Sequence, residues 1–374
     1  MNESPFSGSI AAGADIGAFE MVLAIRTAQG HIEYCDIPLS DNDNVNMIFR
    51  RFRGKVLPSV GCGAWRLSET WSTNLGVLIE KHREPVCIWA AIEYNLSQVV
   101  SGSFSAYRYD LTRANCATLH AISSPFPSRV SIDGIKVDVS LEELNSSFPI
   151  LLVNVKTGTS FYRLDSPSEF VRVGGSSIGL STVGALSKSL AGCESLAACV
   201  ALARKLVHPS EADLLVSDIY GGDCDSIGLP GNIIASCFGK ANNARIPAPD
   251  MAKSLLDLIC INTAQLTNLH ASLHGCKQAV IVGSIGEVPE LTECIQRVLA
   301  ILSKGKDTLR AVYLEQSRYL GCLGALLRRE KLVAGLSETF IDVPVSTATV
   351  ADGFADETYT HLRVISLPIV HRPT

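Results

Sequence analysis

The stretch "PILLVNVKTGTSFYRL" (149–164) consists of two apolar runs joined by a short polar turn that contains glycine. Apolar runs separated by such a turn are typical of a β-hairpin. The stretch "AAGADIGAFEMVLAI" (11–25) repeats this design near the start of the chain. The duplicated hairpin predicts two related α/β lobes, and we place the boundary between them near residue 148.

The chain after the second hairpin has clear helical and strand periods. Apolar residues recur at helical spacing over 181–207, 250–273 and 289–304, and "QAVIVGS" (278–284) is typical of a buried parallel strand. Helices that alternate with apolar strands predict an α/β lobe with a largely parallel sheet. In the first lobe, "VCIWAAI" (86–92) fits a buried strand or the end of a helix. The predicted organisation is a first lobe over 1–148, a second lobe over 149–330 and a β-containing extension over 331–374.

The composition indicates a globular protein with two lobes. The chain has 374 residues, 47% of them hydrophobic and 18% charged, and its net charge is −5. This mild acidity gives no support for nucleic-acid binding. The first ten residues lack the basic start of a secretory signal, and no apolar run approaches the roughly 18 residues of a membrane span. We therefore expect a cytoplasmic protein that does not enter a membrane.

Cysteine and histidine usage gives little support for a metal site. The twelve cysteines are dispersed without any CxxC pair, which favours small buried side chains over zinc ligands. His270 and His274 lie one helical turn apart and could share a metal, but no third ligand is suggested nearby. An ordinary helix face is the favoured interpretation of this pair.

The stretch "FVRVGGSSIGLSTVGALSKSL" (170–190) begins like a loop that holds phosphate against a helix N-terminus. Small residues let backbone N–H groups approach an anion, and the helix that follows adds the positive end of its dipole. A tight strand-to-helix turn explains the glycines equally well. The small residues concerned are Gly174, Gly175, Ser176, Ser177 and Gly179.

Arg172 stands directly before this loop, and Thr157 and Ser160 belong to the turn of the second hairpin. One guanidinium and two hydroxyls in a single pocket would suit a substrate that carries a carboxylate, because arginine grips a carboxylate with two parallel hydrogen bonds. Whether the three residues meet is not decided by their spacing.

Asp15 ends an apolar run in the turn of the first hairpin, next to Gly17. A carboxylate there can hold Mg²⁺ through water while the N–H groups of the turn meet phosphate oxygens, although a turn aspartate also serves local hydrogen bonds. Farther on, "YLEQSRYLGCLGALL" (313–327) places Gly321 and Gly324 on one helix face, where a backbone or a flat ring can approach closely. Helix packing would need the same glycines.

Four motifs together resemble a known family. The motifs "RVGGSSIG", "DIYGGD", "GLPG" followed by "ASCFGK", and "YLGCLGALL" occur in the order and spacing of type II pantothenate kinases. The resemblance runs from about residue 13 to residue 328. It implies an actin-like (ribonuclease H-like) two-lobed kinase fold with an interlobe cleft, a dimer, and ATP-dependent phosphorylation of pantothenate to 4'-phosphopantothenate, the first step of coenzyme A biosynthesis. It also implies Mg²⁺ with the ATP, and an acyl-coenzyme A as a candidate regulator.

The resemblance assigns roles to individual residues. The turn "KTGTS" aligns with the family's pantothenate-holding GSGVS turn, so Thr157 and Ser160 stand at its two serines, and Arg172 stands at the arginine that meets the substrate carboxylate. "SFSAYRYD" aligns with the segment that ends in the catalytic glutamate, which puts Asp110 in the place of the general base. The positions assigned to ATP are Asp15, Gly17, Gly174, Gly175, Ser176, Ser177, Gly179, Gly321 and Gly324, with Asp15 also placing Mg²⁺.

Departures from the family pattern cluster where ATP phosphates and the base should lie. Ala18, Phe19 and Val22 replace a glycine, a threonine and a lysine of the phosphate hairpin. Ser103, Phe104 and Ser105 replace three glycines, and Leu180 and Ser181 interrupt another glycine run. Such losses remove electrostatic stabilisation of a transition state. Two hypotheses follow: a pantothenate kinase that still turns over, or a catalytically impaired subunit that binds pantothenate or acyl-coenzyme A and pairs with an active kinase chain.

Overall fold

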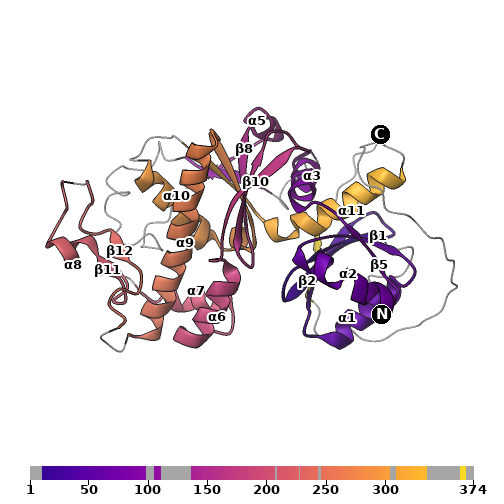
Figure 1. The fold of residues 1–374 in the computed structure, drawn as a ribbon, viewed down its shortest axis with the longest axis horizontal. Helices are drawn as coiled ribbons and strands as arrows, with labels where there is room; N and C mark the ends of the chain where they lie inside the picture. The colour runs from indigo at the N-terminus through magenta and orange to yellow at the C-terminus, as the bar shows by residue number, and fades with distance from the viewer. Residues whose placement is uncertain are drawn as a thin grey trace. The chain divides into compact units, whose positions relative to one another are not determined.

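The computed structural model describes residues 11–97, 105–110, 136–206, 209–226, 228–242, 246–303, 309–334 and 363–367. These form two compact units (Figure 1): unit 1 comprises residues 1–104 and 319–374, and unit 2 comprises residues 105–318. The chain therefore enters unit 2 well before the predicted boundary at residue 148. The reason is β6 (Ala106–Tyr109), which pairs with β14 (Arg310–Leu314) inside unit 2.

Unit 1 contains a mixed sheet with the strand order β15-β3-β2-β1-β4-β5. The predicted hairpin at 11–25 is confirmed as β1 and β2, which pair antiparallel, and β4 and β5 run parallel to β1. The predicted extension contributes β15, which pairs antiparallel with β3. The strands are β1 (Ala11–Ile16), β2 (Glu20–Arg26), β3 (Ile32–Pro38), β4 (Val56–Val60), β5 (Leu78–Lys81) and β15 (Arg363–Leu367).

Unit 2 contains a mixed sheet with the strand order β10-β9-β8-β13-β14-β6-β7. The second predicted hairpin is confirmed as β8 and β9, and the predicted parallel strand at 278–284 is β13, which lies between β8 and β14 and is parallel to both. A separate short pair is formed by β11 and β12. Besides β6 and β14, the strands are β7 (Lys136–Asp138), β8 (Ile150–Val155), β9 (Thr159–Leu164), β10 (Phe170–Ser176), β11 (Leu214–Leu215), β12 (Ile234–Ser236) and β13 (Gln278–Gly283).

The two units share one strand plan. In each sheet, three strands that follow one another along the chain pair antiparallel, each with the next. Two further strands lie on the free side of the first of these strands and run parallel to it. The resulting order is β3-β2-β1-β4-β5 in unit 1 and β10-β9-β8-β13-β14 in unit 2. This is the strand order of the actin-like (ribonuclease H-like) fold. The α/β fold class and the duplication predicted from the two hairpins are confirmed.

The helices of unit 1 show why one segment was ambiguous in the sequence. The segment 86–92 lies in α3 and is buried on nearly all sides, so it carries no clear helical period. The helix α11 packs against α3 and β1, although it follows the last strand of unit 2 in the chain. The helices are α1 (Asn42–Arg51), α2 (Cys62–Leu75), α3 (Glu84–Ser97) and α11 (Leu320–Val333).

The helices of unit 2 surround one long helix, α9, against which α6, α7 and α10 pack. The predicted period at 181–207 is two helices, because Gly192 ends α6 in the left-handed conformation (φ 68°). The helices are α5 (Leu141–Asn145), α6 (Leu180–Ala191), α7 (Leu196–Ala203), α8 (Val216–Tyr220), α9 (Ala248–Leu273) and α10 (Pro289–Leu302), with 3₁₀ turns η3 (Ser284–Glu287) and η4 (Ser317–Tyr319).

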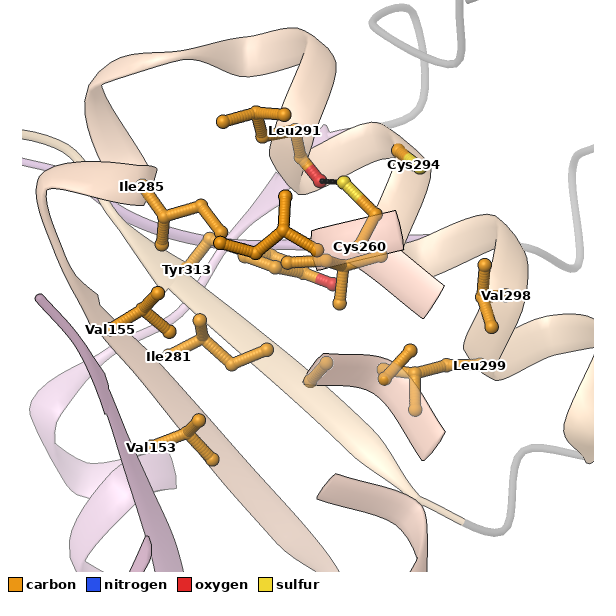
Figure 2. Packing of buried hydrophobic residues seen from close by; sticks show 14 of the residues in the cluster. Val153, Val155, Cys260, Ile281, Ile285, Leu291, Cys294, Val298, Leu299 and Tyr313 are labelled. Atoms are coloured by element: carbon orange, nitrogen blue, oxygen red, sulfur yellow. Dashed lines mark hydrogen bonds between the residues drawn. The ribbon is translucent and has the colours of Figure 1, made fainter. Parts of the chain in front are cut away.

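The core of unit 2 uses cysteine as an apolar side chain. Figure 2 shows Cys260 of α9 facing Leu291 and Cys294 of α10, beside Tyr313 of β14. The Cys260 thiol lies 3.7 Å from the carbonyl oxygen of Leu291. Burial, together with the neighbouring Cys260, raises the pKa of Cys294 well above its ordinary value. Of the eleven cysteines that the structure describes, eight are buried, as the sequence predicts.

Among the described residues, no single helix is both long and apolar enough to cross a membrane. The helices α6 and α7 meet that criterion of length and composition only as a pair with a bend of 58° between them.

Glu80 joins β5 to α11 in unit 1 and yields a prediction about acid stability. Arg329 donates to its carboxylate at 2.7 Å, and His82 lies 2.8 Å away. Burial alone would raise the pKa of Glu80, but the hydrogen bond and charge of His82 and the charge of Arg329 lower it below 4.5.

A carboxyl group whose pKa is lowered on folding stabilises the protein above its unfolded pKa, and this contribution is lost as the pH falls through the folded pKa. We therefore expect unit 1 of the unsubstituted protein to lose stability progressively below pH 4.5, and the Glu80→Gln variant to lose less over the same interval. Urea unfolding followed by tryptophan fluorescence at stepwise lower pH measures this. Equal slopes for both proteins would contradict the prediction.

Candidate functional site

The turn of the β8–β9 hairpin is joined to the loop after β10. The backbone N–H of Leu180 donates to the carbonyl oxygen of Lys156 at 2.7 Å, and the Thr159 hydroxyl donates to the carbonyl of Ile178 at 2.9 Å. Gly179 packs so closely against Gly158 that a Cβ would overlap its backbone. The structure therefore brings together the two segments that were predicted to hold substrate and phosphate.

A β-bulge in β10 turns Arg172 toward Ser160. Arg172 pairs with Tyr162 and Gly175 pairs with Ser160, and the register shifts between these two rungs. In a regular strand, residues three apart face opposite sides of the sheet, but the extra residue of the bulge puts Arg172 and Gly175 on the same side. The Arg172 guanidinium lies over Gly175, where a Cβ would overlap its Nη2 atom. Arg172 and Ser160 therefore share one face, with the guanidinium exposed.

The loop that precedes α6 is fixed by side-chain hydrogen bonds. The Ser176 hydroxyl accepts from the N–H of Ile178 and donates to Asn262 of α9, both at 3.1 Å. The Thr182 hydroxyl donates to the carbonyl of Ser177 at 3.1 Å. Gly179 is the N-cap of α6, so the glycine pattern breaks at Leu180 because the helix begins there. Thr157 and Ser177 are exposed beside this N-terminus.

Asp110 does not lie at this end of the sheet. One row of paired residues crosses four strands, from β6 to β8: Tyr107, Tyr313, Ile281 and Val153. Strand β6 runs antiparallel to β8. Asp110 therefore lies three residues toward the start of β8, whereas the hairpin turn follows its end. At about 3.3 Å per residue along a strand and 4.8 Å between strands, Asp110 is on the order of 20 Å from Ser160. We call Arg172, Ser160 and Thr157 the carboxylate clamp. The assignment of Asp110 as the base for a substrate at this clamp is not supported. Ser103 and Phe104 lie outside the described residues.

The residues assigned to the other half of the ATP site belong to unit 1. Asp15 is the last residue but one of β1 and is 5% exposed. A Cβ on Gly61 would lie 2.8 Å from one carboxylate oxygen, and a Cβ on Gly321 would overlap the other. A carboxylate is the ligand type that Mg²⁺ prefers, but both oxygens of Asp15 face backbone, so the side chain does not present an oxygen to a hydrated cation.

Gly324 has a packing role in unit 1. A Cβ there would overlap the carbonyl group of Cys87 in α3, so the glycine lets α11 approach that helix at backbone distance. For Gly324 this contact corresponds to helix packing, one of the two explanations that the sequence left open, whereas a Cβ on Gly321 would meet the side chains of Asp15 and Val60 in β1 and β4.

The substituted hairpin tip of unit 1 has its own contacts. The N–H of Gly17 donates to the carbonyl of Glu20 at 2.8 Å, which closes a tight turn, and Phe19 at the tip is 70% exposed. Val22 is 5% exposed in the core, so a lysine at that position would be buried. Arg66 of α2 donates to the carbonyl of Ala18 at 3.1 Å. No sequence motif pointed to Arg66.

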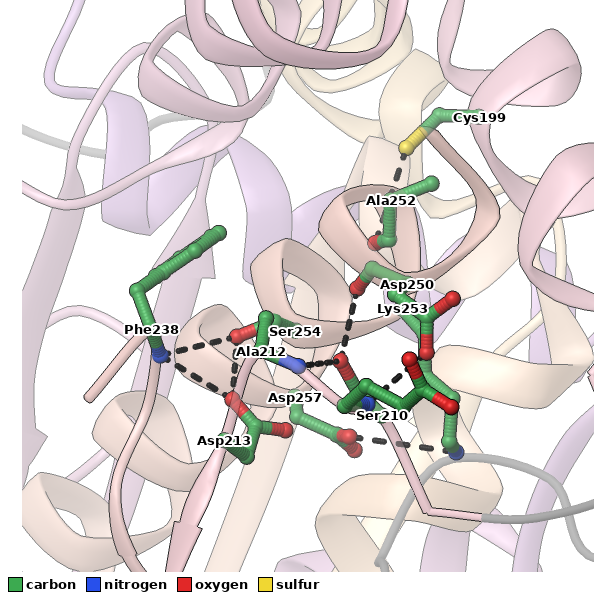
Figure 3. A network of polar contacts seen from close by, with 11 residues as sticks. Cys199, Ser210, Ala212, Asp213, Phe238, Asp250, Ala252, Lys253, Ser254 and Asp257 are labelled. Atoms are coloured by element: carbon green, nitrogen blue, oxygen red, sulfur yellow. Dashed lines mark hydrogen bonds and ion pairs between the residues drawn. The ribbon is translucent and has the colours of Figure 1, made fainter. Parts of the chain in front are cut away.

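A buried polar network fixes part of the segment 218–240 (Figure 3). The N–H of Phe238 donates to Asp213 at 3.0 Å and to the Ser254 hydroxyl at 3.1 Å, which holds Phe238 at a positive φ of 58°. The Ser254 hydroxyl also donates to Asp213. Burial raises the pKa of Asp213 despite these hydrogen bonds and two nearby lysines. The network attaches this segment to α9 and therefore has a structural role.

His270 and His274 stack with ring centroids 6.0 Å apart. Within the described ranges, no group of three histidine, cysteine or acidic side chains is arranged to hold a metal ion.

Comparison with known proteins places the chain in a family. The family model described as Fumble matches residues 26–328. The chain belongs to the Fumble family. Curated relatives of this Fumble protein include pantothenate kinases, the family that the four motifs resemble. The chain is 30% identical over 283 residues to pantothenate kinase 2 of Oryza sativa subsp. japonica, and the match covers 74% of this chain and 28% of the relative.

Other relatives show the same partial coverage. The Fumble chain is 30% identical to the 4'-phosphopantetheine phosphatase of Mus musculus, over 73% of this chain and 30% of the relative. It is 29% identical to pantothenate kinase 1 of Arabidopsis thaliana, over 71% of this chain and 64% of that protein. The chain thus spans less than a third of the length of the first two relatives.

Solved structures of similar fold include two nucleotide complexes. One is an activator of the 2-hydroxyisocaproyl-CoA dehydratase from Clostridium difficile with bound ADPNP, with 10% identity and a TM-score of 0.46 over 90% of this chain and all of that one. The other is a ROK family glucokinase from Streptomyces griseus with glucose and AMPPNP, with 12% identity and a TM-score of 0.40 over 86% of this chain and all of that one.

Proposed function

We propose that this chain binds pantothenate at the β9–β10 face of unit 2 and phosphorylates it with ATP to 4'-phosphopantothenate in the cytoplasm. The observation that carries the proposal is the bulge that brings the Arg172 guanidinium to the rung of Ser160 and Gly175. A fork of N–H donors beside a hydroxyl matches the carboxylate end of pantothenate. Family membership and the curated kinases support the same substrate.

The first role of the site is to hold and orient the substrate. Arg172 binds the carboxylate, Ser160 and Thr157 offer hydroxyls to its polar backbone, and the N-terminus of α6 lies beside Thr157 for a phosphate. ATP supplies the phosphoryl group. Holding both reactants in place is the larger part of catalysis in phosphoryl transfer, because the protein has little covalent chemistry to perform.

A coupled assay with purified protein, ATP, Mg²⁺ and pantothenate tests this function. Phosphopantothenate that forms with the unsubstituted chain and is lost in Arg172→Gln supports it. Because the register separates Asp110 from the clamp, we expect Asp110→Asn to keep turnover within about twofold of the unsubstituted chain. Loss of turnover in Asp110→Asn would instead indicate that Asp110 is the general base.

A second candidate function is favoured by the position of Asp110 and by the altered hairpin tip. Eight bonds separate the pantothenate carboxyl carbon from its terminal hydroxyl oxygen, roughly 10 Å at about 1.2 Å per bond. Asp110 lies too far away to take that proton. A subunit that binds pantothenate or acyl-coenzyme A and pairs with an active kinase chain fits this arrangement.

The oligomeric state distinguishes the two candidates. A homodimer that turns over alone supports the kinase, whereas copurification with a second, intact kinase chain, together with binding of pantothenate but no turnover in isolation, supports the impaired subunit. Light scattering coupled to chromatography, followed by mass spectrometry of the peak, gives this answer.

A further inference from the structure

His270 lies on the last turn of α9 and contacts the back of the clamp. Its ring centroid is 4.7 Å from that of Phe161 in β9, with 31° between the ring planes. A Cβ on Gly174 would overlap two ring atoms of His270, Cε1 and Nε2. Phe161 and Gly174 are cross-strand partners, so the imidazole fills the space that a side chain at position 174 would take.

Gly174 adjoins the bulge that orients Arg172. The register shifts between Arg172 and Gly174, so the backbone displaced by the bulge is the backbone that His270 contacts. The Cβ positions of Gly174 and Gly175 lie on opposite faces of the sheet, and the side chain of another residue occupies each of them. The imidazole fills the space on one face and the Arg172 guanidinium fills the space on the other.

We infer that His270 is a positioning residue of the carboxylate clamp: by filling the space beside Gly174, its ring holds the bulge that puts Arg172 on the face of Ser160. This inference rests on the proposed function, because it assumes that Arg172 binds the substrate carboxylate. His270 does not itself contact the clamp face.

The surroundings of His270 indicate that the neutral ring acts through its shape. Its Nδ1 atom is buried and has no hydrogen-bond partner among the residues that the structure describes. Burial, and the adjacent His274 to a smaller extent, lower the pKa of His270 below its ordinary value. A side chain with these surroundings contributes packing against Gly174 and Phe161 in place of a charge.

The test compares binding of pantothenate with binding of pantothenol, whose alcohol replaces the carboxylate, by isothermal titration calorimetry. In Gly174→Ala the new methyl group meets the His270 ring, so the bulge must shift. Loss of a charge-assisted hydrogen-bond pair is expected to weaken pantothenate binding about 10-fold to 100-fold. Pantothenol binding stays within about twofold, because it makes no such pair.

Removing the ring should compensate for the added methyl group. In the double variant Gly174→Ala with His270→Ala, the methyl group enters the vacated space and supports the bulge in place of the ring, so we expect a preference for pantothenate above that of either single variant. His274→Ala is the matched control, since it removes the neighbouring imidazole at the C-cap of α9, which is not among the atoms nearest to the Cβ position of Gly174. It should leave the preference unchanged.

The outcomes separate this inference from the proposed function. If the unsubstituted chain binds neither ligand, the proposed function fails and the inference falls with it. If the unsubstituted chain prefers pantothenate and Gly174→Ala keeps that preference, or the double variant shows no recovery, the inference is overturned while the proposed function stands. Should Gly174→Ala fail to fold, His270→Ala against His274→Ala decides, and equal preference in those two variants overturns it.

Discussion

Replacing Arg172 with glutamine is expected to weaken pantothenate binding about 100-fold, because a planar fork of charged donors becomes a single neutral amide. The guanidinium lies over Gly175, on the face of Ser160, and is exposed to an incoming ligand. Lysine keeps the charge but presents a point donor, so Arg172→Lys is expected to recover only part of the affinity, about tenfold below the unsubstituted chain. Titration calorimetry with pantothenate measures both changes.

The control for this experiment is Arg163 on the neighbouring strand. Arg163 forms an ion pair with Asp165 at 2.6 Å, and both side chains are 39% exposed. Because exposed ion pairs contribute little, Arg163→Gln should change pantothenate affinity by about twofold or less. Pantothenol should bind the Arg172 and Arg163 variants equally. If Arg172→Gln weakened pantothenol as much as pantothenate, Arg172 would be maintaining the shape of the site and not gripping a carboxylate.

The duplicated α/β plan could be predicted from the sequence because each hairpin is local. The stretches 11–25 and 149–164 contain their own turns, and the strand at 278–284 is apolar throughout, so neighbouring residues determine each element. The lobe boundary could not be predicted in this way. It depends on the pairing of Ala106–Tyr109 with Arg310–Leu314, two short strands about 200 residues apart in the chain.

The candidate site was predicted in its parts but not in its geometry. Sequence position puts Arg172 and Gly175 three residues apart, which in a regular strand means opposite faces, and only the bulge reverses this. The contact between Gly174 and His270 joins residues 96 positions apart. Neither residue type signals the other, since a glycine beside a loop and a histidine on a helix both have simpler explanations.

Asp110 illustrates a limit of aligning motifs. The alignment put it in the place of a catalytic glutamate, but the direction of β6 relative to β14 decides which end of the sheet it reaches. Strand direction is set by pairing with residues on the far side of the fold, and a local motif carries no information about it. The departures at Ala18, Phe19 and Val22 were visible in the sequence because the phosphate hairpin is itself local.

Replacing Gly324 with alanine is expected to destabilise unit 1 by about 2 to 3 kcal/mol, because a Cβ at that position overlaps the main chain of Cys87 in α3. Alanine is intrinsically the better helix former by about 1 kcal/mol, so the clash must exceed that gain before any loss is measured. Backbone atoms of two packed helices cannot yield as a flexible side chain would, and α11 must move away from α3. A valine at the same position should be worse than alanine.

Tryptophan fluorescence reports the unfolding of unit 1, and Gly184 of unit 2 provides a control substitution. All three tryptophans, Trp65, Trp71 and Trp89, belong to unit 1, so their fluorescence follows the unfolding of that unit alone.

Gly184 lies inside α6 of unit 2 with nothing within 4 Å of its Cβ position, so Gly184→Ala should stabilise unit 2 by about 0.5 to 1 kcal/mol. Gly324→Ala should then lower the urea midpoint seen by fluorescence, and Gly184→Ala should raise the midpoint seen by circular dichroism while leaving the fluorescence midpoint in place. If Gly324→Ala were as stable as the unsubstituted chain, the close approach of α11 to α3 would be contradicted, and with it the packing role of Gly324.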